Sequence, residues 1–247
     1  MELNFIYLIT FLLVTLQTIV GVGILVLGTP ILLILNYNII EIMNMLLPIS
    51  ILTSLTNYLY LRFNKKILNI NLDKNIKKNF IFIFLPGIFL GLFLTKKFFI
   101  YINFEILVSI VIFISLYIKW KFENIINLLP LSIKKIILIF ISIIHGLTNS
   151  GGTLLTIFFT AFNKNKKNQS RFSITFYYLI LAFVQYLSFL IIFQKQLTIN
   201  YPFEILILII FSIFVGNVIV KFISENFFKK IIELLALFSA IFLLLNN

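Results

Sequence analysis

The sequence contains no cysteine, a single histidine and few charged residues. Without cysteine the chain can form no disulfide, no thiolate nucleophile and no cysteine-ligated metal site. Charged residues make up 11% of the 247 positions, whereas soluble domains carry about 25%. Hydrophobic residues make up 61%, and the mean hydropathy is +1.12. A soluble domain of this size needs a polar surface that this composition cannot supply, which excludes soluble enzymes, nucleic-acid binders and disordered proteins.

Long stretches without charge dominate what the sequence does contain. A transmembrane helix needs about 20 mainly apolar residues, or about 17 when the flanking side chains reach the interface. Eight uncharged runs approach or exceed this length, the shorter ones with help from end residues: 3–40, 42–61, 79–95, 106–118, 136–163, 172–194, 205–220 and 234–247. The first run is too long for a signal-peptide core and lacks a cleavage motif, so we expect it to remain in the mature protein. We therefore predict an all-α polytopic membrane protein, with one transporter domain over residues 1–247.

The lengths of these runs repeat, as 38, 20, 17 and 13 residues and then 28, 23, 16 and 14. Such a pattern predicts an internal duplication, and we place repeat one at residues 1–125 and repeat two at 130–247. Residue matches follow in the same order: Gly23-Ile24-Leu25 with Gly152-Thr153-Leu154, Asn57 with Gln185, Gly87-x-x-x-Gly91 with Ser212-x-x-x-Gly216, and Ser115 with Ser239. We interpret the spaced small residues of the third match as helix-packing positions.

The net charge of +12 indicates topology rather than a nucleic-acid partner. If each run crosses the membrane once, the lysines and arginines divide 11 to 9 between the two sides. If the first and fifth runs enter and return to the same side, they divide 17 to 3. The positive-inside rule favours the second arrangement. It predicts two inverted repeats, each a broken or re-entrant helical hairpin followed by three transmembrane helices, with both termini outside the cell membrane.

The first and fifth runs each contain a break at which the chain could turn, at Gly21-Val22-Gly23 and at Asn149-Ser150-Gly151-Gly152. A continuous helix over residues 5–35 would be about 46 Å long, beyond a hydrocarbon core of about 30 Å. Thr29-Pro30 is an alternative position for the first break. A half-helix that begins at the bilayer centre offers free N–H groups and a positive dipole end to an anion. No lysine or arginine lies inside a run, so we expect N–H and hydroxyl donors to bind it. The candidate residues are Gly21, Val22, Gly23, Asn149, Ser150, Gly151, Gly152 and Thr153.

Further polar side chains lie in the runs beside these breaks. Gln17 and Thr18 precede the first break, and Asn57 and Gln185 are matched amides in the second and sixth runs. Intramembrane polar groups are candidates for function, although hydrogen bonds between helices would also explain them. His145 could carry a coupling proton or face the substrate, or it could be a neutral buried histidine.

At these residues the chain resembles a known family. Gly21-Val22-Gly23 followed by Pro30, and His145-Gly-Leu-Thr-Asn-Ser-Gly-Gly152, are similar to the paired glycine-rich motifs of the sulfite exporter TauE/SafE family, also called TSUP, the 4-toluene sulfonate uptake permease family. The resemblance spans nearly the whole chain. It implies transport of sulfite, sulfonates or other small organic anions.

The function we predict is that of a permease or exporter that moves small anions by alternating access around a midplane site. We expect a small anionic substrate, a proton or sodium ion as the coupling ion, contact with the lipid bilayer, and no cofactor, metal or nucleic acid. An intramembrane enzyme is disfavoured because the runs contain one histidine and no aspartate. A structural or assembly subunit, or a transporter of another organic acid or a neutral solute, remains the alternative.

Overall fold

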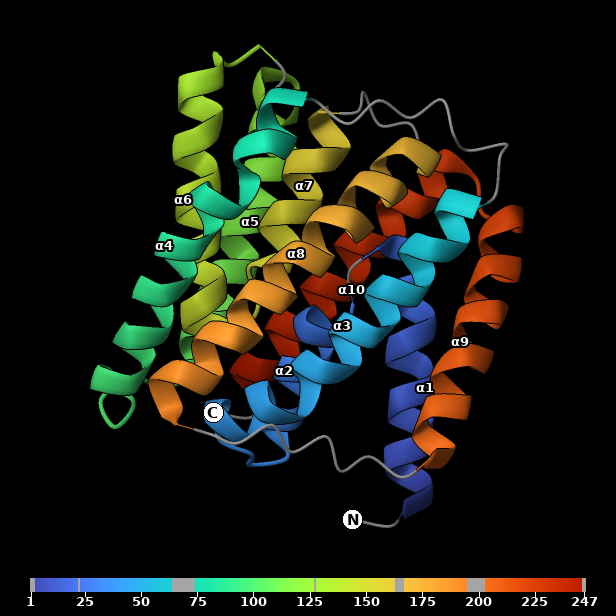
Figure 1. The fold of residues 1–247 in the computed structure, drawn as a ribbon, viewed down its shortest axis with the longest axis horizontal. Coiled ribbons are helices and arrows are strands. Elements are labelled where there is room, and N and C mark those ends of the chain that lie inside the picture. Colours follow the sequence, from blue (N-terminus) through green and yellow to red (C-terminus); the bar gives the residue numbers. More distant parts are fainter. Residues whose placement is uncertain are drawn as a thin grey trace.

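The computed structural model describes residues 3–21, 23–63, 74–126, 128–162, 167–194 and 203–245. These residues form ten helices and no strand (Figure 1): α1 Leu3–Val20, α2 Ile24–Ile34, α3 Ile39–Phe63, α4 Lys74–Phe98, α5 Phe104–Ile126, α6 Leu131–Thr148, α7 Gly152–Phe162, α8 Lys167–Phe193, α9 Phe203–Phe222 and α10 Glu225–Leu245. The predicted all-α class is confirmed.

Five stretches within the described residues are long and apolar enough to cross a membrane: Ile39–Phe63, Phe80–Phe98, Leu131–Thr148, Lys167–Phe193 and Phe203–Phe222. Large apolar side chains cover the outside, with Phe82 exposed to 81% and Phe214 to 65%. Serine, threonine and amide side chains are instead buried between the helices. This distribution suits a lipid solvent, and the prediction of a polytopic membrane protein is confirmed.

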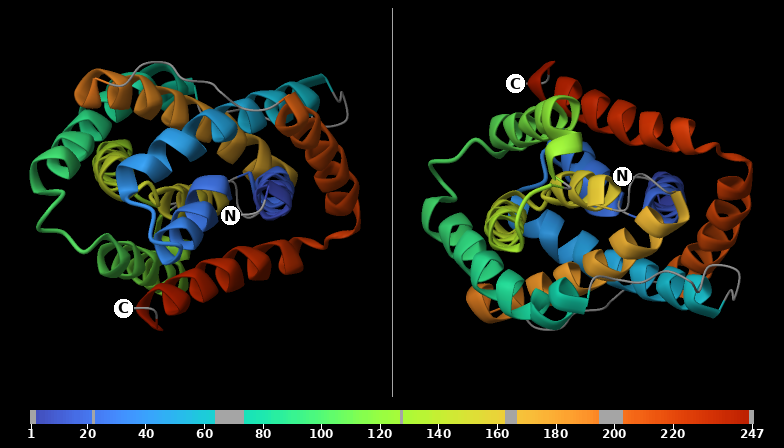
Figure 2. Two further views of the ribbon diagram at one scale, coloured as in Figure 1. Left: turned by 90° about the horizontal axis from the view of Figure 1, so that it is seen from below. Right: turned by 90° about the horizontal axis from the view of Figure 1, so that it is seen from above.

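The first and fifth runs each form two helices separated by a short break. Three residues separate α1 from α2, and another three separate α6 from α7. The two helices of each pair contact each other, and the chain reverses direction at each break (Figure 1). We call residues 21–23 the first tip and residues 149–151 the second tip. In Figure 2 the helices α3, α4, α5, α8, α9 and α10 are arranged around these two hairpins.

Contacts between helices come in matched pairs. Helix α4 packs on α6 while α9 packs on α1, and α2 packs on α3 while α7 packs on α8. Helix α5 likewise contacts α7 while α10 contacts α2. Small residues form the first pair of contacts. A Cβ on Gly91 would lie 2.8 Å from the Leu147 nitrogen, and one on Gly216 would lie 2.7 Å from the Thr18 Cβ. The predicted packing role of these glycines is confirmed.

Basic residues gather at one end of the molecule, which we call the basic end. Helices α3, α5, α7 and α9 end there, and α4, α6, α8 and α10 begin there, whereas both chain termini lie at the opposite end (Figure 1). The basic end carries Arg62, Lys119, Lys121, Lys134, Lys135, Lys167, Arg171, Lys221 and Lys230. The opposite end carries Lys96 and Lys97 together with Glu41, Glu105 and Glu204.

Candidate functional site

The first tip is a tight reversal that requires glycine. Gly21 has φ +92°, in the left-handed region that residues with a Cβ rarely adopt, and its N–H donates to the Gln17 carbonyl at 2.7 Å. A Cβ on Gly23 would lie 2.8 Å from the Gln17 nitrogen. Val22 lies outside the described residues. Pro30 lies inside α2, so the alternative break at Thr29-Pro30 is wrong.

Gln17 stabilises this tip through hydrogen bonds made by both the oxygen and the nitrogen of its side-chain amide. Its Oε1 accepts from the Ile24 N–H at 3.0 Å, at the start of α2. Its Nε2 donates to the Ser54 Oγ at 2.9 Å and to the Ser50 carbonyl at 3.1 Å. The donor that α2 offers at this position is therefore already used by the protein.

The second tip has the same backbone geometry with different residues. Asn149 has φ 61°, and its N–H donates to the His145 carbonyl at 2.8 Å. A Cβ on Gly151 would lie 2.6 Å from the His145 Cβ. Ser150 accepts a hydrogen bond from the Thr153 Oγ1 at 2.8 Å through its carbonyl. Gly152 begins α7.

The two tips correspond residue by residue at a constant offset of 128. Gly21 and Asn149 (149 − 21 = 128) are the positive-φ residues, each bonded to the residue four positions earlier. The N–H of Leu27 donates to the Gly23 carbonyl, just as that of Leu155 donates to the Gly151 carbonyl. Gly23 therefore corresponds to Gly151. The sequence comparison paired Gly23 with Gly152, which is displaced by one residue. That pairing rested on residue type, whereas the hydrogen bonds of the turn pair Gly23 with Gly151.

The predicted site residues fall into two groups, one at each tip. Gln17, Thr18 and Asn57 surround the first tip, and Asn57 donates from its Nδ2 to the Thr18 carbonyl at 3.4 Å. His145 and Gln185 lie at the second tip, where the Gln185 Nε2 donates to the Asn149 Oδ1 at 3.2 Å and to the His145 carbonyl at 3.3 Å.

The tips pass each other instead of meeting end to end. Asn149 donates from its Nδ2 to the Thr29 Oγ1 at 2.9 Å, and Thr29 lies within α2, beyond its first turn. The second tip thus lies beside the middle of the short helix α2, and Thr29 becomes a candidate site residue that the sequence did not reveal. The sequence suggested Thr29 as a possible helix start, whereas its side chain contacts the opposite hairpin.

Arg171 corrects the expectation that no cation would be buried at the site. It borders an uncharged run and was counted with the loop charges, yet it is 2% exposed. Its Nε donates to the Thr18 carbonyl at 2.8 Å, and its Nη2 donates to the Asn217 Oδ1 at 2.7 Å. A weaker contact of 3.4 Å joins Nη2 to the Asn57 Oδ1. All these acceptors are uncharged, so they do not neutralise the guanidinium.

Helices α3 and α8 each present a line of buried side chains with a spacing of seven, which places them on one helix face. On α8 the line is Arg171, Tyr178 and Gln185. On α3 it is Met43, Ser50 and Asn57, at the same offset of 128. The regular spacing of polar residues in these two runs was the signal that could have revealed Ser50 and Tyr178.

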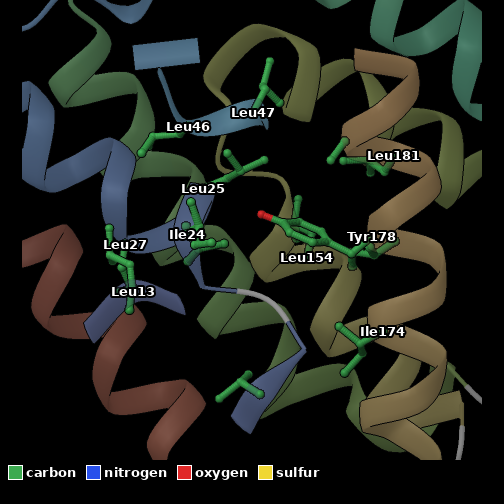
Figure 3. Packing of buried hydrophobic residues seen from close by; sticks show 14 of the residues in the cluster. Leu13, Ile24, Leu25, Leu27, Leu46, Leu47, Leu154, Ile174, Tyr178 and Leu181 are labelled. Carbon is green, nitrogen blue, oxygen red and sulfur yellow. The ribbon is translucent and has the colours of Figure 1, made fainter. Parts of the chain in front are cut away.

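Tyr178 lies between the two tips on α8. Figure 3 shows its hydroxyl extending toward α2, where Leu25 lies. Its ring meets the His145 ring edge-on at a centroid distance of 6.1 Å. The Ser50 side chain and the Leu25 backbone are its polar neighbours, but they do not meet hydrogen-bonding geometry.

Several buried polar atoms around Tyr178 have no hydrogen bond to any described residue: the Tyr178 hydroxyl, both ring nitrogens of His145 and the Gln185 Oε1. An unsatisfied buried polar group costs about 1–3 kcal/mol, and native proteins retain few of them. The arrangement offers hydroxyl and imidazole donors, with the unneutralised Arg171 two turns away on α8, which is suited to binding an anion.

The model of the family Sulfite exporter TauE/SafE matches residues 6–243. No curated protein and no solved structure matches the chain. The matched segment contains both hairpins and all the site residues described above. The chain therefore belongs to the sulfite exporter TauE/SafE family.

Proposed function

We propose that this protein is a permease for small oxyanions, including sulfur-containing ones such as sulfite and organosulfonates, in the cell membrane. The observation that carries the proposal is the pair of broken hairpins whose buried tips hold polar side chains and the unneutralised Arg171. Irregular backbone at membrane depth is tolerated where it is buried in protein or lines a polar cavity, and such breaks commonly form the substrate site of secondary transporters.

We propose further that residues 1–125 and 130–247 are inverted repeats. The matched helix contacts and the equal backbone geometry of the two tips support this relation. Each repeat has five helices, and an odd number of helices gives the two repeats opposite directions through the membrane. Alternating access would then follow as one half moves against the other around the hairpin tips.

We infer the orientation of the protein in the membrane from the distribution of its lysines and arginines. The basic end carries most of the described lysines and arginines, so we place it in the cytoplasm and both termini outside. A moving anion interacts with the membrane potential at about 2.3 kcal/mol per charge per 100 mV. This potential, or a proton or sodium gradient, would drive transport.

Flux of ³⁵S-sulfite into proteoliposomes containing the purified protein tests the proposal. Wild-type protein should accumulate label above protein-free vesicles, and unlabelled methanesulfonate should compete. Gly152→Leu places a branched side chain at the start of α7 and should abolish flux without loss of insertion. Val218→Leu enlarges a side chain that is 37% exposed on the outer surface and should transport normally. Wild-type flux by Gly152→Leu would contradict the role of the tips, and no flux of any small oxyanion by wild type would contradict the function.

A further inference from the structure

The two tips have similar backbone hydrogen bonds but differ in the hydrogen bonds that their side chains make. At the first tip, Gln17 uses both ends of its amide, toward Ile24 and Ser54. The residue at the corresponding position of the second tip is His145, because 145 − 17 = 128. The Gln185 side chain is its polar neighbour, but neither of its ring nitrogens makes a hydrogen bond of good geometry within the described residues. The side chain at this position is thus fully hydrogen-bonded at the first tip and unbonded at the second.

The same difference separates the corresponding positions on α3 and α8. Asn57 is bonded to the Thr18 carbonyl and to Arg171. Its counterpart Gln185 uses its Nε2 but has no partner for its Oε1 among the residues described. Tyr178, the counterpart of Ser50, is 0% exposed and its hydroxyl is equally unbonded. At these three pairs of corresponding positions, the unbonded polar atoms therefore all belong to the second half.

We propose, resting on the function proposed above, that the oxyanion binds asymmetrically, at the second tip, with the Tyr178 hydroxyl and the His145 imidazole as its direct hydrogen-bond donors. The two rings come from α8 and α6 and lie 6.1 Å apart between centroids, so one small ligand is within reach of both. Arg171 lies seven residues from Tyr178 on the same face of α8, about 10 Å away along the helix. It attracts the anion by its charge while its hydrogen bonds secure the first tip.

The surroundings of Tyr178 restrict the ligand class. Leu25 and Leu154 lie around its hydroxyl end (Figure 3), and both are buried. A small ion with oxygens on one side and an apolar or lone-pair face on the other suits this environment. Sulfite and methanesulfonate have that shape, so they are the probes for the test.

Two substitutions remove only the proposed donors. Tyr178→Phe deletes the hydroxyl, and His145→Phe deletes both ring nitrogens while keeping a planar ring. Neither change breaks a hydrogen bond to a described residue, so thermal stability should not fall from a lost bond. The matched control is Tyr186→Phe, because the Tyr186 hydroxyl is also buried on α8 and unbonded among the described residues but lies off the face that carries Tyr178.

Isothermal titration of the detergent-purified protein with methanesulfonate, and with sulfite under nitrogen, measures the effect. Tyr178→Phe should weaken binding about tenfold, which corresponds to ~1.4 kcal/mol, with an unchanged or higher Tm. His145→Phe should weaken binding similarly, and Tyr186→Phe should bind like wild type. Wild-type affinity of Tyr178→Phe would overturn the asymmetric site, and so would an equal loss in Tyr186→Phe. Absence of binding by the wild-type protein would instead overturn the proposed function itself.

Discussion

Replacing Arg171 by methionine tests how the first tip is held together. Methionine is the residue at the corresponding position of the first half, Met43, which is fully buried among apolar neighbours. The change therefore keeps an unbranched side chain on α8 and removes the guanidinium. It leaves the Thr18 carbonyl without its 2.8 Å donor and the Asn217 Oδ1 without its 2.7 Å donor.

The expected loss of stability follows from these two acceptors. Each buried acceptor that loses its donor costs about 1–3 kcal/mol. The Asn57 Nδ2 still donates to the Thr18 carbonyl at 3.4 Å, and the guanidinium charge no longer needs to be desolvated, so the sum is reduced. We expect a net loss of about 2–4 kcal/mol, or a fall in Tm of about 5–15 °C for a chain of this size.

Circular dichroism of the detergent-purified protein during heating measures this shift. Lys221→Met is the matched control, because it removes a cation from an exposed position at the end of α9 and should change stability by about 0.5 kcal/mol or less. An unchanged Tm for Arg171→Met, or an equal shift in the control, would refute the role of Arg171 at the tip. Oxyanion binding provides a second measurement. A unit charge about 10 Å away contributes about 1.7 kcal/mol at an effective dielectric constant of 20, so affinity should fall by about tenfold or slightly more.

Three further predictions concern the tip, the ion pair and the topology. Gly151→Ala should lower the free energy of unfolding by about 1–3 kcal/mol, because its Cβ meets the α6 backbone at 2.8 Å; an unchanged urea midpoint would contradict the close approach. Lys119, 3% exposed, forms an ion pair of 3.0 Å with Glu233, which is 31% exposed. Glu233→Gln leaves the buried ammonium without its ion-pair partner, so it should destabilise the protein by about 3–5 kcal/mol, and by more than Lys119→Met does. A larger loss of stability in Lys119→Met, measured by thermal melts, would contradict this. Single cysteines at Lys121 and Glu204, in a chain with no native cysteine, should react with an impermeant maleimide from opposite sides of the membrane, the first from the cytoplasm; reaction from one side would contradict the topology.

The helical class and both breaks could be predicted from the sequence because they depend on local chemistry. Charge-free runs indicate membrane helices, and Gly21 and Asn149 are residue types that tolerate a positive φ. The positions of most candidate side chains followed, since residues near a break in sequence are also near it in space.

What the sequence could not supply depends on how distant helices meet. The contact between Asn149 and Thr29 requires the two hairpins to slide past each other, and no local pattern encodes that displacement. Arg171 was missed because a charge at the edge of a run is indistinguishable from a loop charge until α1 and α9 pack against it. Asn217 is a polar residue within the very apolar α9 and could have been noticed in the sequence. Its role as an acceptor for Arg171 is evident only from the structure.

The most direct test of the account is to locate a bound oxyanion. Selenite has the pyramidal shape of sulfite, and selenium scatters anomalously. A crystal structure of the protein soaked in selenite should show an anomalous peak within hydrogen-bonding distance of the Tyr178 hydroxyl, beside His145 and the second tip. A peak at another position in the protein, or no peak at a concentration that inhibits sulfite flux, would contradict the account.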